Sequence, residues 1–425
     1  MARAMKDSGI EWIGEIPANW ECVPIRSLFQ EVNRKNVQGL VTKALKFTYG
    51  EIVPKIDFEA EEDDYVANTI QNYTIVEPGT IMLNGLNLNF DFVTRRIGLV
   101  KERGVITSAY MAFRPIDGQR MMSEYATYLL KSYDHCKAFH NMGGGVRKIL
   151  NFSELKHQYI LYPRLDIQQS IVAFLDDKCA EIDALMADVQ AQIETLEQYK
   201  RSVITEAVTK GLNPNVPMKD TGIICIGSIP LSWPVSRFKY HATVKANLVQ
   251  PEGYEDFPQI APDNIEKNTG KLLSHGTVEE AGIISGNHLF HRGQILYSKI
   301  RPNLNKAIIA PFDGLCSADM YPIETNEDTK FVLYLMLSNY FVEQVSLVIR
   351  DRVKMPKINQ DELGQIRVVI PCMIEQNQIV AYLDAKCAEI DAIIDGKRQQ
   401  LAVLEEYKKS VIFEYVTGKK EVPVA

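Results

Sequence analysis

The chain has 425 residues and a formal net charge of −7, and at roughly 150 residues per domain its length predicts two or three domains. No run of about 18 apolar residues and no apolar N-terminal segment is present, which argues against a membrane span or a signal peptide. The seven cysteines include no Cys-x-x-Cys pair, which disfavours disulfides and structural zinc, so we expect a cytoplasmic protein with no metal site.

Residues 5–20 carry a motif that returns at residues 218–233. It reads Met-Lys-Asp-[Ser/Thr]-Gly-Ile-x-x-Ile-Gly-x-Ile-Pro-x-x-Trp in both places. A second segment, Pro-x-x-x-x-Gln-x-x-Ile-Val-Ala-x-Leu-Asp, begins at Pro163 and again at Pro371, an offset of 371 − 163 = 208. The same offset continues without a gap through Thr209 and Thr417. The chain is therefore two copies of one unit, each a body followed by a nearly duplicated arm.

Both bodies read as mixed structure with many short strands. Apolar alternations broken by turns predict the strands, and the segments 124–139 and 329–346 each predict a helix. One strand is common to both bodies, at residues 79–84 and 293–298, and the sequences diverge after it. The divergent loops are rich in Asn, Arg and Lys, which can read the edges of adenine and guanine. Alternatively, the Asn residues only cap turns.

Basic residues gather locally despite the acidic total. Local clusters, not the net charge, decide whether a protein binds phosphates, although such a cluster can also be a solvated face. The glycine-rich and basic loops 143–151 and 350–359 follow the predicted helices and could approach a phosphate backbone. In the first body the residues expected to contact DNA are Asn84, Asn87, Asn89, Arg95, Arg96, Lys101, Gly144, Gly145, Arg147 and Lys148. In the second body they are Tyr297, Ser298, Lys299, Arg301, Asn303, Asn305, Lys306, Arg350, Arg352, Lys354 and Lys357.

The two arms show apolar residues at heptad spacing. Each predicts a helix of about 40 residues, near 60 Å at 1.5 Å per residue, whose single apolar stripe needs a partner. We expect the two arms to pair as an antiparallel coiled coil; the alternative is that each arm packs on its own body. Lys397 interrupts the second seam. The predicted seam comprises Leu175, Cys179, Ile182, Met186, Val189, Ile193, Leu196 and Val203 with Leu383, Cys387, Ile390, Ile394, Leu401, Leu404 and Val411.

These patterns predict an α+β fold, in which two mixed α/β bodies are joined by two long helices in a pseudo-two-fold duplication. A turn-rich stretch after the first arm marks the boundary between the copies. The expected organisation is a first body over 1–162, a helix over 163–211, a connector with the second motif over 212–230, a second body over 231–370, a second helix over 371–418, and a tail over 419–425.

Catalytic motifs are not evident. The sequence has no Asn-Pro-Pro-Tyr motif for amino-methyl transfer, no glycine-rich loop placed for a methyl-donor cofactor, and no Gly-Lys-Ser/Thr after the glycines of 143–145. The triplet Glu406-Tyr407-Lys408 resembles part of a nuclease site but lies inside the second heptad pattern. We therefore expect no catalytic residues and no cofactor in this chain.

The paired Trp-containing motifs and the paired Gln-x-x-Ile-Val-Ala-x-Leu-Asp arms resemble the DNA-specificity subunit of type I restriction-modification enzymes. The resemblance covers essentially the whole chain. It implies that residues of about 18–162 and 231–370 are target-recognition domains, each reading one half of a bipartite DNA site. It also implies two adenine-N6 methyltransferase subunits and two motor-nuclease subunits as partners, which would hold S-adenosylmethionine, ATP and Mg²⁺.

This resemblance and the residues agree on a non-catalytic recognition subunit for double-stranded DNA in the cytoplasm of a bacterium or archaeon. Unlike loops on shared strands predict an asymmetric target, and the similar arms predict equivalent docking surfaces for two methyltransferase subunits. Two alternatives remain at this point. The chain could be a coiled-coil scaffold that binds proteins and not DNA, or an enzyme that acts alone.

Overall fold

The structure is a computed structural model of the whole chain, and it describes residues 3–55, 70–93, 95–142, 144, 148–352 and 354–423. The chain divides into two compact units. Unit 1 comprises Met1–Asp188 and Gln400–Ala425, and unit 2 comprises Val189–Gln399. Each unit therefore contains one body, the first half of one long helix and the second half of the other.

The elements of unit 1 begin with a hairpin and end at the first long helix. They are β1 (Met5–Asp7), β2 (Glu15–Pro17), β3 (Glu21–Pro24), β4 (Phe29–Glu31), β5 (Leu45–Thr48), β6 (Glu51–Pro54), β7 (Thr74–Val76), β8 (Ile81–Leu83), β9 (Ile97–Leu99), β10 (Gly104–Ile106), β11 (Met111–Pro115), α2 (Ser123–His135), α3 (Phe152–Leu155), β12 (Tyr159–Tyr162) and α4 (Leu165–Lys210). Helix α4 continues into unit 2.

The elements of unit 2 follow the same plan and include one five-stranded sheet. They are β13 (Met218–Asp220), β14 (Ser228–Pro230), β15 (Val235–Arg237), β16 (Ala242–Val244), β17 (Leu248–Val249), β18 (Pro258–Ile260), β19 (Gly276–Thr277), β20 (Asn287–Phe290), β21 (Ile295–Ser298), β22 (Ala307–Ile309), β23 (Gly314–Cys316), β24 (Met320–Thr325), α5 (Thr329–Leu337), α6 (Asn339–Ile349), α7 (Gln360–Gln365), β25 (Arg367–Val369) and α8 (Met373–Val416). Helix α8 continues into unit 1.

Each body is built on an equivalent four-stranded antiparallel sheet. The strand order is β4-β11-β8-β9 in unit 1 and β16-β24-β21-β22 in unit 2. Strand β8 is buried on both faces, because Ile81 and Leu83 pack in the core that contains α2, whereas Met82 packs with the β5–β6 layer. Such two-sided burial explains why the shared strand reads as a continuous apolar run and not as an alternation.

One helix prediction needs correction. The segment 329–346 was expected to be a single helix, but it forms α5 and α6, which meet at 61°. Ser338 interrupts the helical path with an extended backbone (φ −69°, ψ 149°), and its hydroxyl donates to the Leu335 carbonyl. Among the described residues no single helix is long and apolar enough to cross a membrane, and by length and composition alone only this bent pair passes the test.

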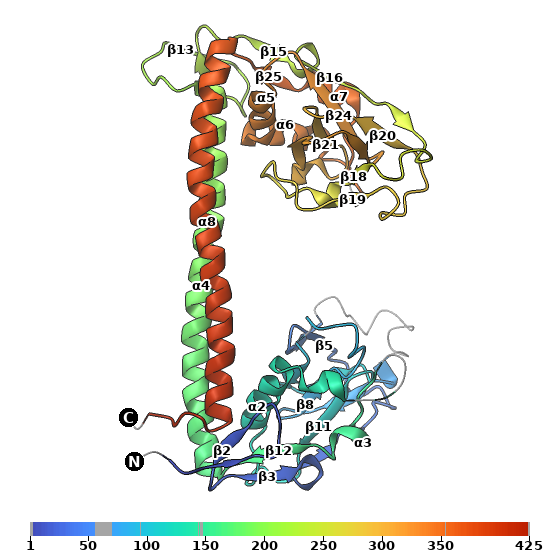
Figure 1. Cartoon of the computed structure of the whole chain (residues 1–425), viewed down its shortest axis with the longest axis vertical. Helices are drawn as coiled ribbons and strands as arrows, with labels where there is room; N and C mark the ends of the chain where they lie inside the picture. The colour runs from blue at the N-terminus through green and yellow to red at the C-terminus, as the bar shows by residue number, and fades with distance from the viewer. Residues whose placement is uncertain are drawn as a thin grey trace. The chain divides into compact units, whose positions relative to one another are not determined.

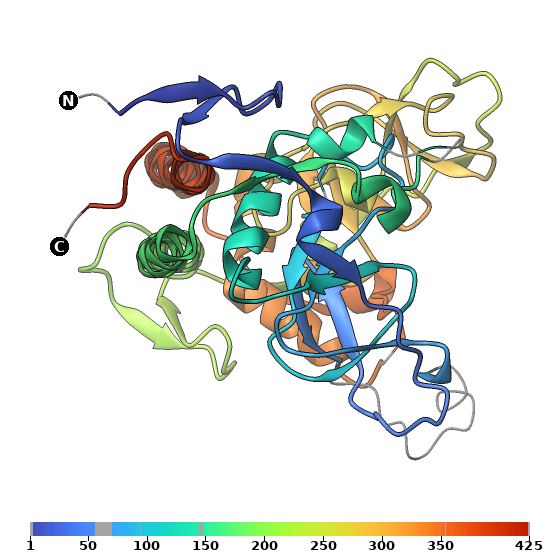
Figure 2. The same ribbon diagram turned by 90° about the horizontal axis from the view of Figure 1, so that it is seen from below.

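The helices α4 and α8 pair antiparallel, side by side (Figures 1 and 2). In unit 1, Leu175 and Cys179 share a core with Val411. In unit 2, Leu383 and Cys387 share a core with Ile204. Every residue predicted for the seam is buried or half-buried, and Lys397 is half-buried within it. The first turns of each arm also pack on their own body, so both packing arrangements weighed from the sequence occur together.

A lysine at a seam position forms an ion pair across the two helices in each unit. Lys200 lies 2.7 Å from the Asp391 carboxylate in unit 2, and Lys408 lies 2.6 Å from Asp183 in unit 1. These pairs are equivalent, since 408 − 200 = 208 and 391 − 183 = 208. An antiparallel pairing of duplicated helices produces this reciprocal pattern.

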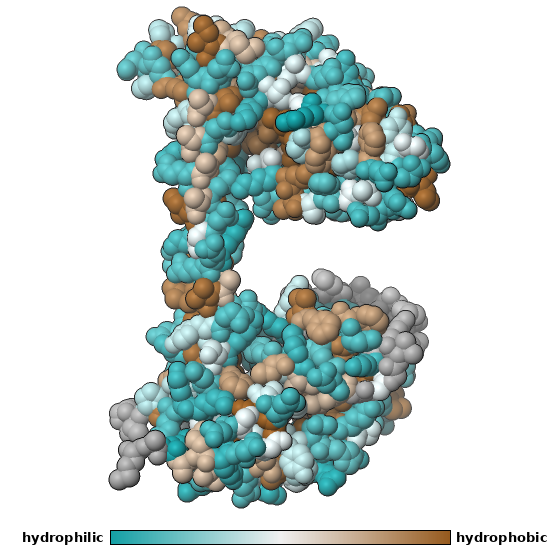
Figure 3. All heavy atoms as spheres, viewed as in Figure 1, coloured by the Kyte–Doolittle hydropathy of each residue, from teal (hydrophilic) through white to brown (hydrophobic). Residues whose placement is uncertain are grey.

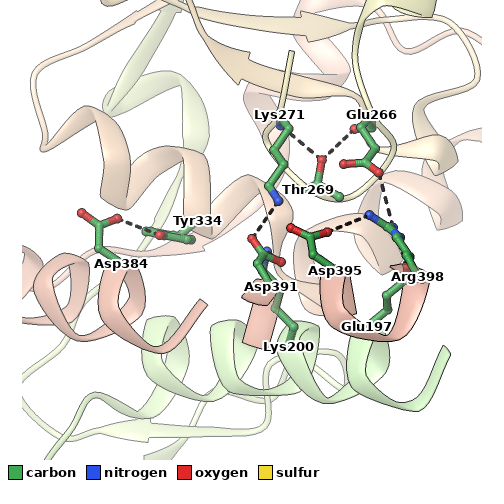
Figure 4. Close-up of polar contacts among 10 residues, drawn as sticks. All are labelled: Glu197, Lys200, Glu266, Thr269, Lys271, Tyr334, Asp384, Asp391, Asp395 and Arg398. Carbon is green, nitrogen blue, oxygen red and sulfur yellow. Dashed lines mark hydrogen bonds and ion pairs between the residues drawn. The ribbon is translucent and has the colours of Figure 1, made fainter. Parts of the chain in front are cut away.

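In unit 2 the Lys200–Asp391 pair belongs to a larger polar network with the body (Figure 4). Lys271 of the second body approaches Asp391 to 3.0 Å, and Arg398 lies 3.6 Å from Glu266 of that body. Burial opposes ionisation of Asp391, but hydrogen bonds from Lys200 and Lys271 outweigh it and hold the pKa of this carboxyl below its ordinary value. The second body is thus fastened to the helices by paired charges.

A duplicated glutamine joins each body to its arm. The side chain of Gln168 accepts a hydrogen bond from the Met122 amide, 2.9 Å away at the start of α2, and donates to the Pro163 carbonyl. Gln376 accepts from the Asp328 amide at the start of α5 (3.0 Å) and donates to the Pro371 carbonyl. Both glutamines are fully buried. The Gln of the repeated arm motif therefore fixes the body helix to the long helix.

The Trp-containing motifs fold as hairpins on the ends of the long helices. Trp20 shares a core with Val416 near the end of α8, and Trp233 shares one with Val208 near the end of α4. A β-carbon added at Gly418 would lie 3.0 Å from the Trp20 ring, and one at Gly211 would lie 3.1 Å from Trp233. Each glycine also has a positive φ, 70° and 73°, as helix C-terminal glycines commonly do.

We predict that Asp391→Ala destabilises unit 2 by about 3 kcal/mol, because it leaves the buried Lys200 ammonium without its partner. The double variant Lys200→Met with Asp391→Leu replaces the pair by apolar side chains and is expected to unfold close to the wild-type temperature. Differential scanning calorimetry of the three proteins measures this. Equal destabilisation of the single and double variants would contradict the assignment of the cost to an unpaired charge.

Candidate nucleic-acid interface

In both bodies a variable loop leaves the shared strand and returns through the neighbouring strand. In unit 1 the loop runs from Asn84 to Arg96, and the Asn84 amide donates to the Arg96 carbonyl at 2.9 Å. In unit 2 it runs from Ser298 to Lys306, and the Ser298 amide donates to the Lys306 carbonyl at 3.0 Å. The two loops differ in length and sequence but are closed by the same backbone bond.

The structure brings each variable loop against the basic loop of the same body. The Leu150 amide donates to the Gly85 carbonyl at 2.9 Å, and the Ile358 amide donates to the Lys299 carbonyl at 3.0 Å. Gly85 is required for this approach in the first body, because a β-carbon there would lie 2.2 Å from the Leu150 carbonyl oxygen. Two segments expected separately from the sequence thus form one surface.

A capping box fixes the end of each basic loop. Asn151 caps α3 with Glu154, and Asn359 caps α7 with Glu362. In both cases the Asn side chain accepts from the Glu amide while the Glu carboxylate accepts from the Asn amide, so two free helix amides are satisfied. The basic loop therefore ends in the same way in both bodies, at a capped helix N-terminus.

Several predicted contact residues are exposed. Asn87 and Arg301 have positive φ values of 52° and 42°, so each projects from a tight turn. The exposed predicted residues that form no side-chain hydrogen bond or ion pair with other described residues are Asn87, Lys101, Gly144, Arg301, Asn303 and Lys354. Lys148 is half-buried, and its carbonyl accepts from the Leu88 amide. Side chains of this kind can donate to base edges or phosphates.

Other predicted residues are engaged within the protein. Arg352 forms a two-point ion pair with Glu362, which raises the pKa of its guanidinium. The partners of the remaining exposed or half-buried cations are Glu405 for Arg95, Asp351 for Arg350, Asp319 for Lys357, the Tyr321 ring for Lys299, and the Pro262 carbonyl with Asp263 for Lys306. Exposed pairs of this kind are weak, so a phosphate could compete for these cations.

Four predicted contact residues are buried, and their assignment to a DNA-facing surface was wrong. Tyr297 and Ser298 belong to the two-sided strand β21, where Tyr297 packs in the core and the Ser298 hydroxyl donates to the Ile300 carbonyl. Asn305 is 1% exposed, and Arg96 is 0% exposed. The Arg96 guanidinium binds backbone carbonyls of its own loop instead of projecting from it.

The other predicted residues lie as follows. Asn84 is half-buried, and its side chain accepts from the Leu86 amide at 3.1 Å, which is the turn-capping role weighed as the alternative. Asn89 is half-buried in the same loop. Gly145 and Arg147 lie outside the described residues.

Sequence reasoning missed Gly85, the capping residues Asn151 and Asn359, and the seam lysines. The Asn-x-x-Glu spacing at 151–154 and 359–362 is the signal that predicts a capping box. The heptad continued from Ile193 reaches Lys200, since 193 + 7 = 200, so spacing places this lysine in the seam. No sequence signal identifies the close approach at Gly85.

The first body has a concentration of positive charge beside its arm. Burial, followed by the charges of Lys409 and Arg95, lowers the pKa of His135 to about 4. Burial and the charge of Lys408 also lower the pKa of Lys131.

Within the described part of the chain, no three His, Cys, Asp or Glu residues are grouped to hold a metal ion. All seven cysteines are described, and all are free.

This arrangement consists of two equivalent frameworks that carry unlike polar loops, joined by a paired-helix arm. A family model described as the type I restriction modification DNA specificity domain matches residues 67–195 and 238–403. The chain belongs to this family of DNA specificity subunits. Its role is therefore recognition of a DNA target in a restriction-modification system.

Named relatives are similar over most of the chain. The Type I restriction enzyme EcoDI specificity subunit of Escherichia coli is 31% identical over 327 residues, 73% of each chain. The putative type I restriction enzyme MjaX specificity subunit of Methanocaldococcus jannaschii is 22% identical over 435 residues, 96% of each chain. The fold is also similar to that of a chain in a solved structure, whose title describes complex assembly and conformational transition of the type I R-M system. The TM-score is 0.65 and the sequence identity is 13%, and the match covers 95% of this chain and 99% of that one.

We predict that Gly85→Ala separates the variable loop from the basic loop of the first body and destabilises that body by about 1–3 kcal/mol, because the added methyl group overlaps the Leu150 carbonyl. Hydrogen exchange should become faster at the Leu88 and Leu150 amides, which bond across the two loops. The matched control is Gly118→Ala in the same body, where a β-carbon meets nothing within 4 Å. Unchanged exchange in the Gly85 variant would contradict this loop pairing.

Proposed function

We propose that this chain reads an asymmetric, bipartite double-stranded DNA target, with one half-site for each body. The observation that carries the proposal is the repeated framework: the same sheet order and the same bond between loops support variable loops of different sequence. Equivalent frameworks offer both bodies the same approach to DNA, while unlike donors select different bases. Two different half-sites follow.

The continuous helices α4 and α8 are proposed to set the spacer between the half-sites. A helix has a fixed rise of 1.5 Å per residue, so the number of residues between the bodies becomes part of the recognised sequence. The partners under this proposal are two adenine-N6 methyltransferase subunits and two motor-nuclease subunits. S-adenosylmethionine, ATP and Mg²⁺ belong to those partners, and this chain contributes recognition without catalysis in the cytoplasm.

Two equivalent exposed patches on the paired helices support the docking of two identical subunits. Leu185 (44% exposed) and Tyr407 (48%) lie in unit 1, and their counterparts Ile393 (45%) and Tyr199 (49%) lie in unit 2, because 393 − 185 = 208 and 407 − 199 = 208. Each side chain directly precedes a seam position, which is a flank that charged residues usually occupy in a coiled coil. Hydrophobic residues interrupt the hydrophilic face of the helices visible in Figure 3. We propose these duplicated patches as the methyltransferase docking surfaces.

The scaffold alternative differs from this proposal in its dependence on salt. DNA binding that uses Lys and Arg weakens steeply as salt concentration rises, whereas a protein scaffold without DNA affinity has no such dependence. The exposed cations next to the variable loops favour the recognition function.

We predict that Lys354→Ala weakens DNA binding by the assembled methyltransferase complex roughly threefold to tenfold at all target sequences and reduces the slope of log affinity against log salt by about 1. Fluorescence anisotropy over a salt series measures both quantities. Lys267→Ala removes an exposed lysine elsewhere on the second body and serves as the control. If both variants change the slope equally, or neither does, the basic loop 350–359 is not the phosphate-binding segment.

We predict that Leu185→Asp removes one of two methyltransferase subunits from the complex, and that Leu185→Asp with Ile393→Asp removes both, because a carboxylate cannot be buried in an apolar contact. Native mass spectrometry of the co-expressed subunits reports the stoichiometry. Val403→Asp is the matched control: Val403 is 68% exposed on α8, but its counterpart in α4 is Thr195 (403 − 208 = 195). Full occupancy in the double variant would show that the subunits dock elsewhere.

A further inference from the structure

We propose that Arg96 is a positioning residue for base recognition, whose buried guanidinium sets the shape of the 84–93 loop and thereby the half-site that the first body reads. The inference rests on the proposed DNA function, and it concerns a side chain that is itself too deeply buried to touch DNA.

The contacts of Arg96 span the whole loop. Its Nη1 donates to the carbonyls of Asn84 (2.9 Å) and Leu86 (2.8 Å), and its Nη2 donates to the carbonyl of Asp91 (2.6 Å). The Asp91 carboxylate lies 3.7 Å away and balances the buried charge. A planar guanidinium holds its donors in a fixed fork, so two carbonyls at the start of the loop and one near its end are fixed relative to one another.

The same loop is held at its far end by residues of the segment that follows α2. His140 Nε2 lies 3.1 Å from the Asp91 carbonyl, which can only accept, so this nitrogen carries the proton. The Phe92 ring stacks on His140 with 4.7 Å between centroids, and the Lys137 ammonium donates to the Phe92 carbonyl. Arg96 and His140 thus both bind the Asp91 carbonyl and fix this end of the loop.

The contacts of Arg96 and His140 with the 84–93 loop together form a clamp on this loop. The backbone of Arg96 connects this clamp to the core of the body. Its amide donates to the buried Asp134 carboxylate of α2 at 2.8 Å. Burial raises the pKa of Asp134, and this amide and the Arg96 charge oppose the shift. In the second body Lys306 holds the corresponding position before β22, but its ammonium donates to the Pro262 carbonyl outside its own loop, at 2.8 Å. The two variable loops are therefore shaped by different contacts.

The residues that the clamp positions are exposed at the tip of the loop. The Phe90 and Asp91 amides both donate to the Asn87 carbonyl, which forms a tight turn and leaves the Asn87 side chain and the Phe90 ring (72% exposed) facing outward. An amide can read adenine, and an aromatic ring can contact the thymine methyl group. Direct readout needs placement within about 0.5 Å, so a loosened loop tolerates several base pairs while phosphate contacts elsewhere persist.

The experiment uses Arg96→Met and Arg96→Lys in the full chain, co-expressed with the methyltransferase subunit, and maps N6-methyladenine across the host genome. Arg96→Met removes all three carbonyl contacts, and Arg96→Lys keeps the charge but loses the planar fork. The expected result is that discrimination falls about tenfold or more at positions of one half-site, while the other half-site keeps its wild-type sequence. The control is Arg114→Met, because Arg114 is an exposed arginine of β11 in the same body whose side chain forms no hydrogen bond or ion pair with other described residues.

The unaffected half-site serves as an internal reference for folding and assembly. Equal relaxation of both half-sites, or an unchanged motif from an assembled Arg96→Met complex, overturns the inference. If Arg96→Met does not assemble, Arg96→Lys decides by the same criteria. Failure of both variants to assemble also overturns it, because Arg96 would then support the whole body and not the loop. A wild-type complex that binds and methylates no defined motif contradicts the proposed function itself, which separates the two failures.

Discussion

Burial of the apolar seams of α4 and α8 against each other is the constraint on which the other features of this protein depend. A helix of 46 or 44 residues with one apolar stripe does not persist alone in water. Because the pairing is antiparallel, the core of each unit combines segments from distant parts of the chain. The Tyr125 hydroxyl of α2, for example, donates to the Val416 carbonyl at the end of α8. The first body therefore has a complete core only when the end of the chain is present.

A second consequence is the separation of framework from recognition. The bonds that hold each variable loop on its strand and against its basic loop are between backbone atoms, and only Gly85 must lack a side chain for them to form. The other side chains of the loop are therefore free to differ between the two bodies without loss of these bonds. The arms have no such freedom, since the seam, the glutamine joints and the reciprocal lysine–aspartate pairs all depend on particular side chains. This difference explains why the arms resemble each other more closely than the bodies do.

The fold was largely predictable from sequence, because the duplication and the heptad spacing extend over long segments. The positions of the variable and basic loops were also predicted, but the role of individual residues was not. Arg96 looks like an exposed cation in the sequence, and only tertiary structure shows that loop carbonyls surround it. Tyr297 and Ser298 belong to a strand that is covered on both faces, which periodicity does not distinguish from a strand with an open face. The break at Ser338 arises in a run without glycine or proline, the usual sequence signals for the end of a helix.

The most direct test of the account is to co-express the wild-type chain with the methyltransferase subunit encoded beside it and to sequence the host DNA for N6-methyladenine. Two equivalent frameworks with unlike loops predict one motif, composed of two different short half-sites separated by a spacer of fixed length. A palindromic motif, a motif with a single half-site, or no methylation from an assembled complex would contradict the account.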